Sequence, residues 1–192
     1  MPAKNSSVLE FLLSRRSRPA KTLTVPVPDR AELVPILTAA ARTPDHGKLE
    51  PWRFIVLEKP ALDRLAGLAQ KRGAALGLPV DKTAKNVAQF ANANLAVAVI
   101  SAPVASQKVP EIEQVFSAGA ACLAMLNAAL AAGWGANWLS GWASHDRTFV
   151  AEGLNLQTHE TVAGIIHIGT ETTAPPERPR PDIAAITTWM GA

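Results

Sequence analysis

Four short apolar runs, set among helical segments, constrain the fold of this chain more than any other feature. They cover residues 54–57, 95–100, 137–142 and 162–169, and each has the length and composition of a buried strand. These strands do not alternate regularly with helices, as the strands of a doubly wound parallel sheet would. The pattern therefore predicts an α+β fold.

Helix boundaries are indicated by capping residues and by glycine. Ser7 is followed three positions later by a glutamate, which predicts a capping box that starts a helix ending near residues 15–16. A helix that begins at Pro60 is expected to end at Gly73, and a long apolar helix is expected to begin at Pro110. Ser144 is expected to cap a short helix near the last strand.

Length and charge limit the classes of protein to consider. The chain has 192 residues, which fits one domain, and only 18% of them are charged against a usual share of about 25%. Such low charge suggests that part of the surface is covered, and dimerisation is one way to cover it. The net charge of +3 suits an anionic small ligand, and the basic residues form no long run, which argues against nucleic acid as a partner.

Cysteine usage and apolar patterning point to a compartment. Cys122 is the only cysteine, so no disulfide framework is possible and a reducing compartment is expected. The first residues contain no signal-peptide core, and the most apolar stretch, residues 117–134, is mostly alanine with Asn127 inside it. We therefore expect a cytoplasmic protein without a membrane partner, and we interpret this stretch as a buried helix.

The C-terminal tail has a composition of its own. Four prolines between positions 175 and 181 exclude a helix or a central strand there, yet apolar residues follow them. An arm over residues 171–192 that lies on a partner subunit would cover those apolar side chains.

Two segments could bind an anionic or flat ligand. Arg15, Arg16 and Ser17 offer charged and hydroxyl donors at a helix end, although the same residues also suit a solvated helix C-terminus. The segment 133–141 combines glycines, which allow close approach of the backbone, with tryptophans and a serine. It could equally be a helix end followed by an aromatic core strand.

A third segment, the loop that carries Arg42 and His46, leaves a helix and leads into a strand, where side chains can be presented to a ligand. A lone histidine in such a loop is more often an ordinary surface residue. The chain shows no GxGxxG, P-loop or GxSxG motif, and its four histidines have no metal-ligand spacing. The sequence therefore predicts no catalytic side chain and no metal; a bound cofactor would carry the chemistry.

Together these segments resemble the nitroreductase family, most closely its small bacterial "minimal nitroreductase" branch. The segments RRSR, RTPDHGKLEPWRF, KVPEIEQVFSAGAACLAM and GWGANWLSG begin at residues 15, 42, 108 and 133, in the order seen in that family, and the match spans about residues 7–169. The resemblance implies a single domain with a central mixed or antiparallel sheet flanked by helices. It also implies an intertwined homodimer with FMN in a cleft between the subunits.

The resemblance also assigns site residues. It implies that FMN is bound by Arg15, Arg16, Ser17, Arg42, His46, Trp138, Leu139 and Ser140. It places the nicotinamide side of the site at Ala128, Ala129, Leu130, Ala131, Ala132 and Gly133. The chain departs from the branch at Leu139, where a basic residue is common, and one flavin contact is thereby in doubt.

The activity implied is an FMN-dependent oxidoreduction in two steps, from NADH or NADPH to the flavin and then to a nitro compound or quinone-like acceptor. Two alternatives stay open. One is other flavin chemistry on the same fold, such as a specialised metabolite reductase or a dehalogenase. The other is a basic dimer that binds a nucleotide without catalysis.

Overall fold

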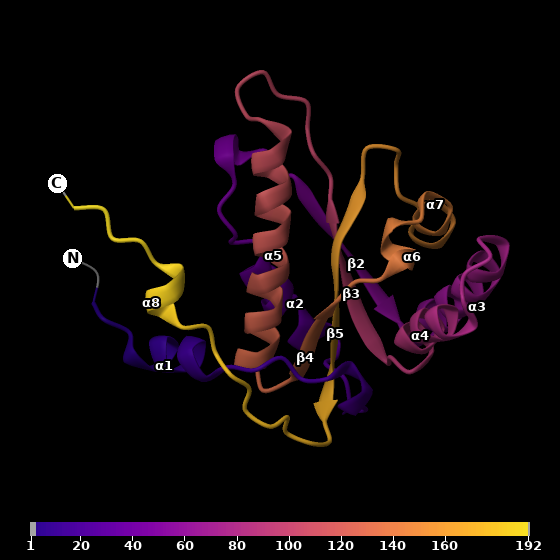
Figure 1. Ribbon diagram of the computed structural model, residues 1–192, viewed down its shortest axis with the longest axis horizontal. Coiled ribbons are helices and arrows are strands. Elements are labelled where there is room, and N and C mark those ends of the chain that lie inside the picture. The colour runs from indigo at the N-terminus through magenta and orange to yellow at the C-terminus, as the bar shows by residue number, and fades with distance from the viewer. Residues whose placement is uncertain (1–2, 192) are drawn as a thin grey trace.

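The computed structural model describes residues 3–191 and confirms the α+β fold (Figure 1). Its sheet has the strand order β1-β5-β3-β2, β4 also pairs with β5, and every one of these pairs is antiparallel. The sheet is thus antiparallel throughout, within the range that the resemblance implied. The strands are β1 (Leu23–Thr24), β2 (Trp52–Glu58), β3 (Leu95–Ser101), β4 (Gly135–Leu139) and β5 (Thr161–Glu171).

Two hydrophobic cores lie on the two faces of this sheet. Every residue of β3 is buried, because alternate side chains enter opposite cores: Val97 and Val99 pack on one face, and Ala98 and Ile100 on the other. Figure 1 shows the helices in two layers around the sheet. One layer holds α2 (Arg30–Ala40) and α5 (Glu111–Ala131), and the other α3 (Lys59–Ala75), α4 (Val80–Ala91), α6 (Trp142–His145) and α7 (Arg147–Leu154).

The long helix α5 is a core helix. Among the described residues it is the one helix long and apolar enough, by length and composition alone, to cross a membrane. It begins one residue after Pro110, and its buried side, which includes Ala118, Cys122, Met125 and Ala129, packs in the core between the sheet and α2. This confirms the interpretation of residues 117–134 as a buried helix.

Two predicted helix boundaries in the first half of the chain were wrong. Asn5 caps α1 (Ser6–Ser14), since its side chain accepts a hydrogen bond from the Val8 amide at 3.2 Å, so the cap predicted at Ser7 does not form. The helix predicted to end at Gly73 continues to Ala75, because Gly73 is buried against Thr83, where a Cβ would come within 2.5 Å. The left-handed glycine that follows α3 is Gly77, with φ +61°.

The region after α5 also differs from prediction. The strand expected over 137–142 is Gly135–Leu139, and Trp142 instead begins α6. Asp146, rather than Ser144, caps the next helix, because its side chain accepts a hydrogen bond from the Phe149 amide at 2.8 Å. The chain therefore turns sharply just after β4.

The two ends of the chain extend away from the body on the same side (Figure 1). Neither α1 nor α8 (Ile183–Ile186) contains a buried residue. Two short 3-10 turns, η1 (Ala20–Thr22) and η2 (His46–Lys48), complete the chain. That the tail lies on a partner subunit stays a prediction.

Candidate functional site

The segment that follows α1 is fixed against β4. Arg15 forms the C-cap of α1, and its amide donates to the Phe11 carbonyl at 2.8 Å. The Arg18 amide then donates to the Ala136 carbonyl at 2.8 Å, and the Asn137 side-chain amide donates to the Arg18 carbonyl at 2.6 Å. These bonds hold residues 15–18 beside the strand that leads to the predicted flavin contacts.

This segment carries a cluster of positive charge that we call the arginine cluster: Arg15, Arg16, Arg18 and Arg180, the last from the C-terminal tail. Burial lowers the pKa of Arg15, and the positive charges of Arg180, Arg16 and Arg18 lower it further. The Arg15 side chain donates to the Ser17 hydroxyl at 3.0 Å, but its Nε is buried and has no partner within residues 3–191. Crowded cations and an unsatisfied buried donor are what an anion such as a phosphate would relieve.

Carboxylates neutralise only part of the cluster. Arg18 pairs with Glu171 at 3.1 Å, and Glu177 lies 3.4 Å from Arg16 and 3.0 Å from Arg180. Among the described residues, Arg15 has no acidic partner. Four arginines face two carboxylates, so the cluster keeps a net positive charge, and Arg15 is the member that has no carboxylate beside it in the described part of the chain.

A cavity of about 530 Å³ lies next, between the end of β4 and α4; we call it the β4–α4 cavity. The chain reaches it directly from the arginine cluster, through η1 on one side and through the end of β4 on the other. It is lined by Ala20, Lys21, Lys82, Lys85, Asn86, Ala88, Gln89, Asn92, Ala93, Leu139, Ser140, Gly141, Trp142 and His167.

Asn86 holds the turn after β4 in place. Its side chain is buried, and its Oδ1 accepts a hydrogen bond from the Ala143 amide at 3.3 Å. It also lies directly against Gly141, where an added Cβ would come within 2.6 Å of the Asn86 Oδ1. Glycine is thus needed at this position for space, which lets the backbone of the turn form one wall of the cavity.

Positive charge surrounds the mouth of the cavity. Lys82 and Lys85 on α4 are exposed and line it together with Lys21 of η1. Within the part of the chain that the structure describes, none of the three has an acidic partner within salt-bridge distance. The cavity therefore favours a ligand that carries or develops negative charge.

Of the three residues predicted on β4, two line this cavity. Leu139 and Ser140 do so, whereas Trp138 does not. Trp138 is paired with Ile166, whose side chain lies in the core on the α5 face, so its indole points away from the cavity and lies over Gly164.

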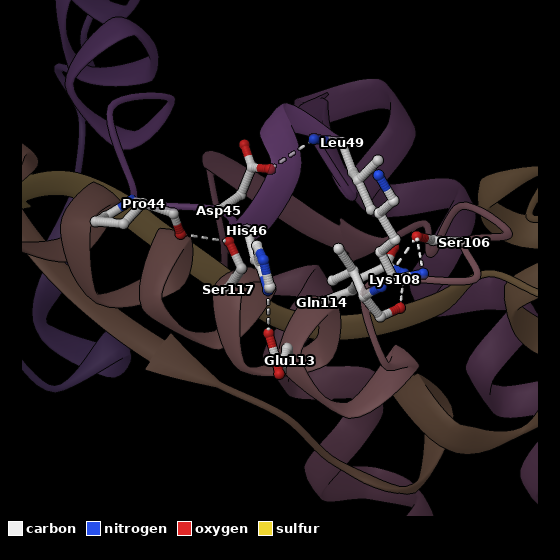
Figure 2. Close-up of polar contacts among 10 residues, drawn as sticks. Pro44, Asp45, His46, Leu49, Ser106, Lys108, Glu113, Gln114 and Ser117 are labelled. Carbon is white, nitrogen blue, oxygen red and sulfur yellow. Dashed lines mark hydrogen bonds and ion pairs between the residues drawn. The ribbon is translucent and has the colours of Figure 1, made fainter.

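Arg42 and His46 lie elsewhere in the molecule. His46 Nδ1 lies 2.7 Å from Glu113 Oε2 in the first turn of α5, and the Pro44 carbonyl accepts a hydrogen bond from Ser117 at 2.9 Å (Figure 2). The arginine cluster lies beside β4, past the other end of this helix, which is about 30 Å long. Within one chain, the structure does not bring Arg42 and His46 to the other predicted flavin contacts.

The predicted nicotinamide-side residues form the end of α5 and the turn into β4. Ala128 and Leu130 are half-buried, Ala129 is fully buried, and residues 131–133 are exposed. Gly133, with φ +88°, ends the helix in the left-handed conformation. None of these residues lines the β4–α4 cavity.

Sequence reasoning missed several residues of the site. Asn86 and Gln89 are three positions apart on α4 and share one helix face, a spacing that could have indicated them. His167 was not predicted as a site residue, and Arg180 lies in a tail for which no role in binding was predicted. Their proximity to the site depends on the tertiary fold.

The sequence of the chain is similar to the sequences of known proteins. The model of the family described as "Nitroreductase family" matches residues 12–170. The Escherichia coli K12 protein YdjA, which carries the provisional name NAD(P)H nitroreductase, is 36% identical over 165 residues, covering 84% of this chain and 87% of YdjA. A Haemophilus influenzae protein with the same provisional name is also 36% identical over 165 residues, with the same coverage.

Solved structures show the same fold at low identity. A nitroreductase-like family protein from Bacillus cereus superimposes with a TM-score of 0.79 at 20% identity, over 99% of both chains. A protein from Desulfovibrio desulfuricans, provisionally described as a nitroreductase and crystallised with FMN, gives 0.74 at 22% identity, over 98% of this chain and 99% of that one. With a family match over residues 12–170 and relatives at 36% identity, the chain belongs to the nitroreductase family.

Proposed function

We propose that this protein is an FMN-dependent NAD(P)H oxidoreductase that reduces nitro compounds or quinone-like acceptors. One observation carries the proposal: the arginine cluster and the β4–α4 cavity adjoin, joined by the same two segments of chain. An anion site next to a cavity with both apolar and polar walls fits a ligand with a phosphate at one end and a flat ring system at the other. The relatives named as NAD(P)H nitroreductases and the FMN-bound neighbour support this reading.

The arginine cluster would hold the phosphate. Arg15 offers the unsatisfied Nε donor, and Arg16 and Ser17 stand beside it. Forked guanidinium donors bind phosphate oxygens in pairs, which fixes orientation as well as position. Arg180 adds a further positive charge from the tail.

The β4–α4 cavity would hold the ring system. Asn86 and Gln89 present amides, and Ser140 and Gly141 present backbone close to the ligand. When bound, FMN supplies two-electron chemistry: hydride enters from NADH or NADPH and leaves to the acceptor in a second step. Lys21, Lys82 and Lys85 would stabilise the negative charge that accumulates on reduction.

Exposed apolar surface supports a homodimer. The accessible surface of the single chain is 11648 Å², whereas a compact monomer of this mass would expose about 8,800 Å². The excess, roughly 2,800 Å² for each chain, is as large as the area that one subunit contributes to an extensive obligate dimer interface. It includes apolar residues of α1, of α5 and of the tail that are 45–94% exposed: Val8, Leu9, Leu12, Leu13, Ile112, Phe116, Leu123, Ile183, Ile186, Trp189 and Met190.

A second subunit would also supply the missing contacts. Arg42 and His46 are too far along α5 to reach the arginine cluster of their own chain. We propose that they contact the flavin held mainly by the partner, and that residues 128–133 border the nicotinamide. The arm over residues 171–192 would then cover the partner's surface. Both reductants are available in the cytoplasm, the compartment that we propose.

The absorption spectrum of the purified, desalted protein tests the cofactor. Flavin bands that bleach on anaerobic addition of NADH or NADPH are expected. A colourless protein that takes up no added FMN would instead favour a non-catalytic nucleotide-binding dimer. Slow turnover with generic nitroaromatics and quinones, despite rapid bleaching, would point to a specialised metabolite reductase.

A mixed dimer tests whether the two subunits share each site. One subunit carries Arg15→Gln and the other His46→Ala, with different affinity tags so that the heterodimer can be purified. If each site combines Arg15 of one chain with His46 of the other, one site has both substitutions and the other has none. One tight FMN site per heterodimer is therefore expected, whereas no tight site would mean that both residues act within the same chain.

A further inference from the structure

His167 is a buried polar residue that the proposed site does not yet use. It lies in the middle of β5, between Ala96 on β3 and Asn137 on β4, and is 2% exposed. Its Nε2 is buried and has no hydrogen-bond partner among residues 3–191. The Asn137 side chain next to it is already bonded to the Arg18 carbonyl. An unpaired imidazole in the central sheet costs stability, so its presence needs a reason.

The charge state of this imidazole limits what it can bind. Burial lowers the pKa of His167 to about 4, so the ring is neutral at pH 7. A neutral imidazole has one N–H donor and one lone-pair acceptor. His167 therefore suits a neutral polar group that offers a carbonyl or an N–H, and it is a poor partner for a phosphate.

The position of His167 points to one end of a flavin. The residue lines the β4–α4 cavity, whose other polar groups include the side-chain amides of Asn86, Gln89 and Asn92. The isoalloxazine ring system has an apolar dimethylbenzene end and a pyrimidine end with alternating C=O and N–H groups. Side-chain amides and a neutral imidazole can hydrogen-bond to the C=O and N–H groups of the pyrimidine end. The dimethylbenzene end has no group with which they could form hydrogen bonds.

We propose that His167 is a flavin-binding residue whose neutral imidazole hydrogen-bonds to the pyrimidine end of the ring system. The inference rests on the proposed FMN function and adds a contact from the central sheet. It explains why an unpartnered histidine is kept in an otherwise apolar strand: the cost in the free protein is repaid when the ligand binds.

Replacement of His167 by leucine and by glutamine tests this. His167→Leu removes an unsatisfied buried polar group, so the melting temperature of the FMN-free protein should stay the same or rise. The same variant should bind FMN about three- to tenfold more weakly, which is the usual value of one net hydrogen bond. Riboflavin should lose the same factor, because the lost contact is to the ring. His167→Gln keeps a donor and an acceptor and should recover part of the affinity.

His159→Leu is the matched control, because His159 is exposed in the turn before β5 and does not line the cavity. Its affinity for FMN should equal that of the wild type. An unchanged Kd in His167→Leu would overturn the inference, as would a fall in melting temperature that accounts for the weaker binding. If the wild type binds FMN but His167→Leu does not differ from it, only this inference fails; if the wild type binds no FMN, the proposed function fails with it.

Discussion

Arg15 should discriminate FMN from riboflavin, because riboflavin has the same ring and ribityl chain but no phosphate. Arg15→Gln removes the half-buried charge at the centre of the arginine cluster, where the buried Nε donor has no partner in the described residues. A hydrogen bond to a charged group contributes about 1.5–3 kcal/mol. Since 1.4 kcal/mol corresponds to a factor of ten, the Kd for FMN should rise roughly 10- to 150-fold.

Titration of the apoprotein with each ligand, followed by quenching of flavin fluorescence, measures both dissociation constants. The wild type should prefer FMN over riboflavin, and Arg15→Gln should lose most of that preference while its Kd for riboflavin changes less than about threefold. The effect should shrink as salt is added, because exposed parts of the cluster are screened. Arg30→Gln, which removes an exposed arginine at the start of α2, is the control for net charge.

Two outcomes would refute this reasoning. Equal losses for FMN and riboflavin would mean that Arg15 supports the fold or the ring site and makes no phosphate contact. An unchanged Kd for FMN would mean that the phosphate lies elsewhere, in which case the crowding of Arg15 by three other arginines has no role in binding.

Three further changes have expected outcomes. Hydrogen bonds from Arg53, at 2.6 and 2.8 Å, hold the pKa of Glu160 at about 2, below its ordinary 4.5. This pair should therefore stabilise the fold above pH 4.5 and cease to do so as the pH falls towards 2. In urea unfolding, Glu160→Gln should lower the free energy of unfolding at pH 7 by about 1–2 kcal/mol. It should also reduce the change in that free energy between pH 4.5 and pH 2, and an unchanged pH dependence would contradict the assignment. Gly141→Ala should weaken FMN binding, because its Cβ would displace the Asn86 amide, and wild-type affinity in a titration would show that the contact is easily relieved. Phe116→Asp, on the exposed side of α5, should give monomers in sedimentation and abolish tight FMN binding, whereas a dimer that still forms would place the interface elsewhere.

The centre of the sheet could be predicted from sequence because β3 and most of β5 are buried on both faces. Every residue of β3 is buried, so its sequence is a continuous apolar run. An amphipathic helix would instead show apolar residues only at every third or fourth position. By contrast, β1 has only two residues and was not predicted. Such a short strand has no pattern of its own and exists only because Leu23 and Thr24 meet the end of β5.

Helix boundaries failed where two local signals competed. Asn5 and Ser7 are both good N-caps, and the sequence does not say which side chain reaches an amide. Gly73 and Gly77 could each end α3, and the choice fell to Gly77 because the buried contact with Thr83 needs a glycine at position 73. In each case the three-dimensional structure determines which of two similar residues caps or ends the helix.

The candidate site also combines residues with a local sequence pattern and residues that only the tertiary structure brings together. Arg15–Ser17 could be proposed from the sequence because charged donors at a helix end form a local pattern, and Ser140 because it lies in a short segment with glycines and tryptophans. Asn86 and His167 could not, because an amide on α4 and an imidazole on β5 acquire meaning only when the fold brings them to one cavity. At Leu139 the resemblance led us to expect a basic residue, and three lysines from other elements line the same cavity.

The placement of the predicted contacts at opposite ends of α5 links cofactor binding to assembly. A single chain presents the arginine cluster beside β4 and His46 at the far end of the helix, with the exposed apolar residues Ile112, Phe116 and Leu123 between them. Two chains that pair along this helix would cover those apolar side chains and bring the two halves of a site together. A ligand that binds only the paired state stabilises it by mass action, so FMN and the interface would strengthen each other. The low share of charged residues would then follow from a surface that the partner subunit covers, and the incomplete site of the single chain would have the same cause.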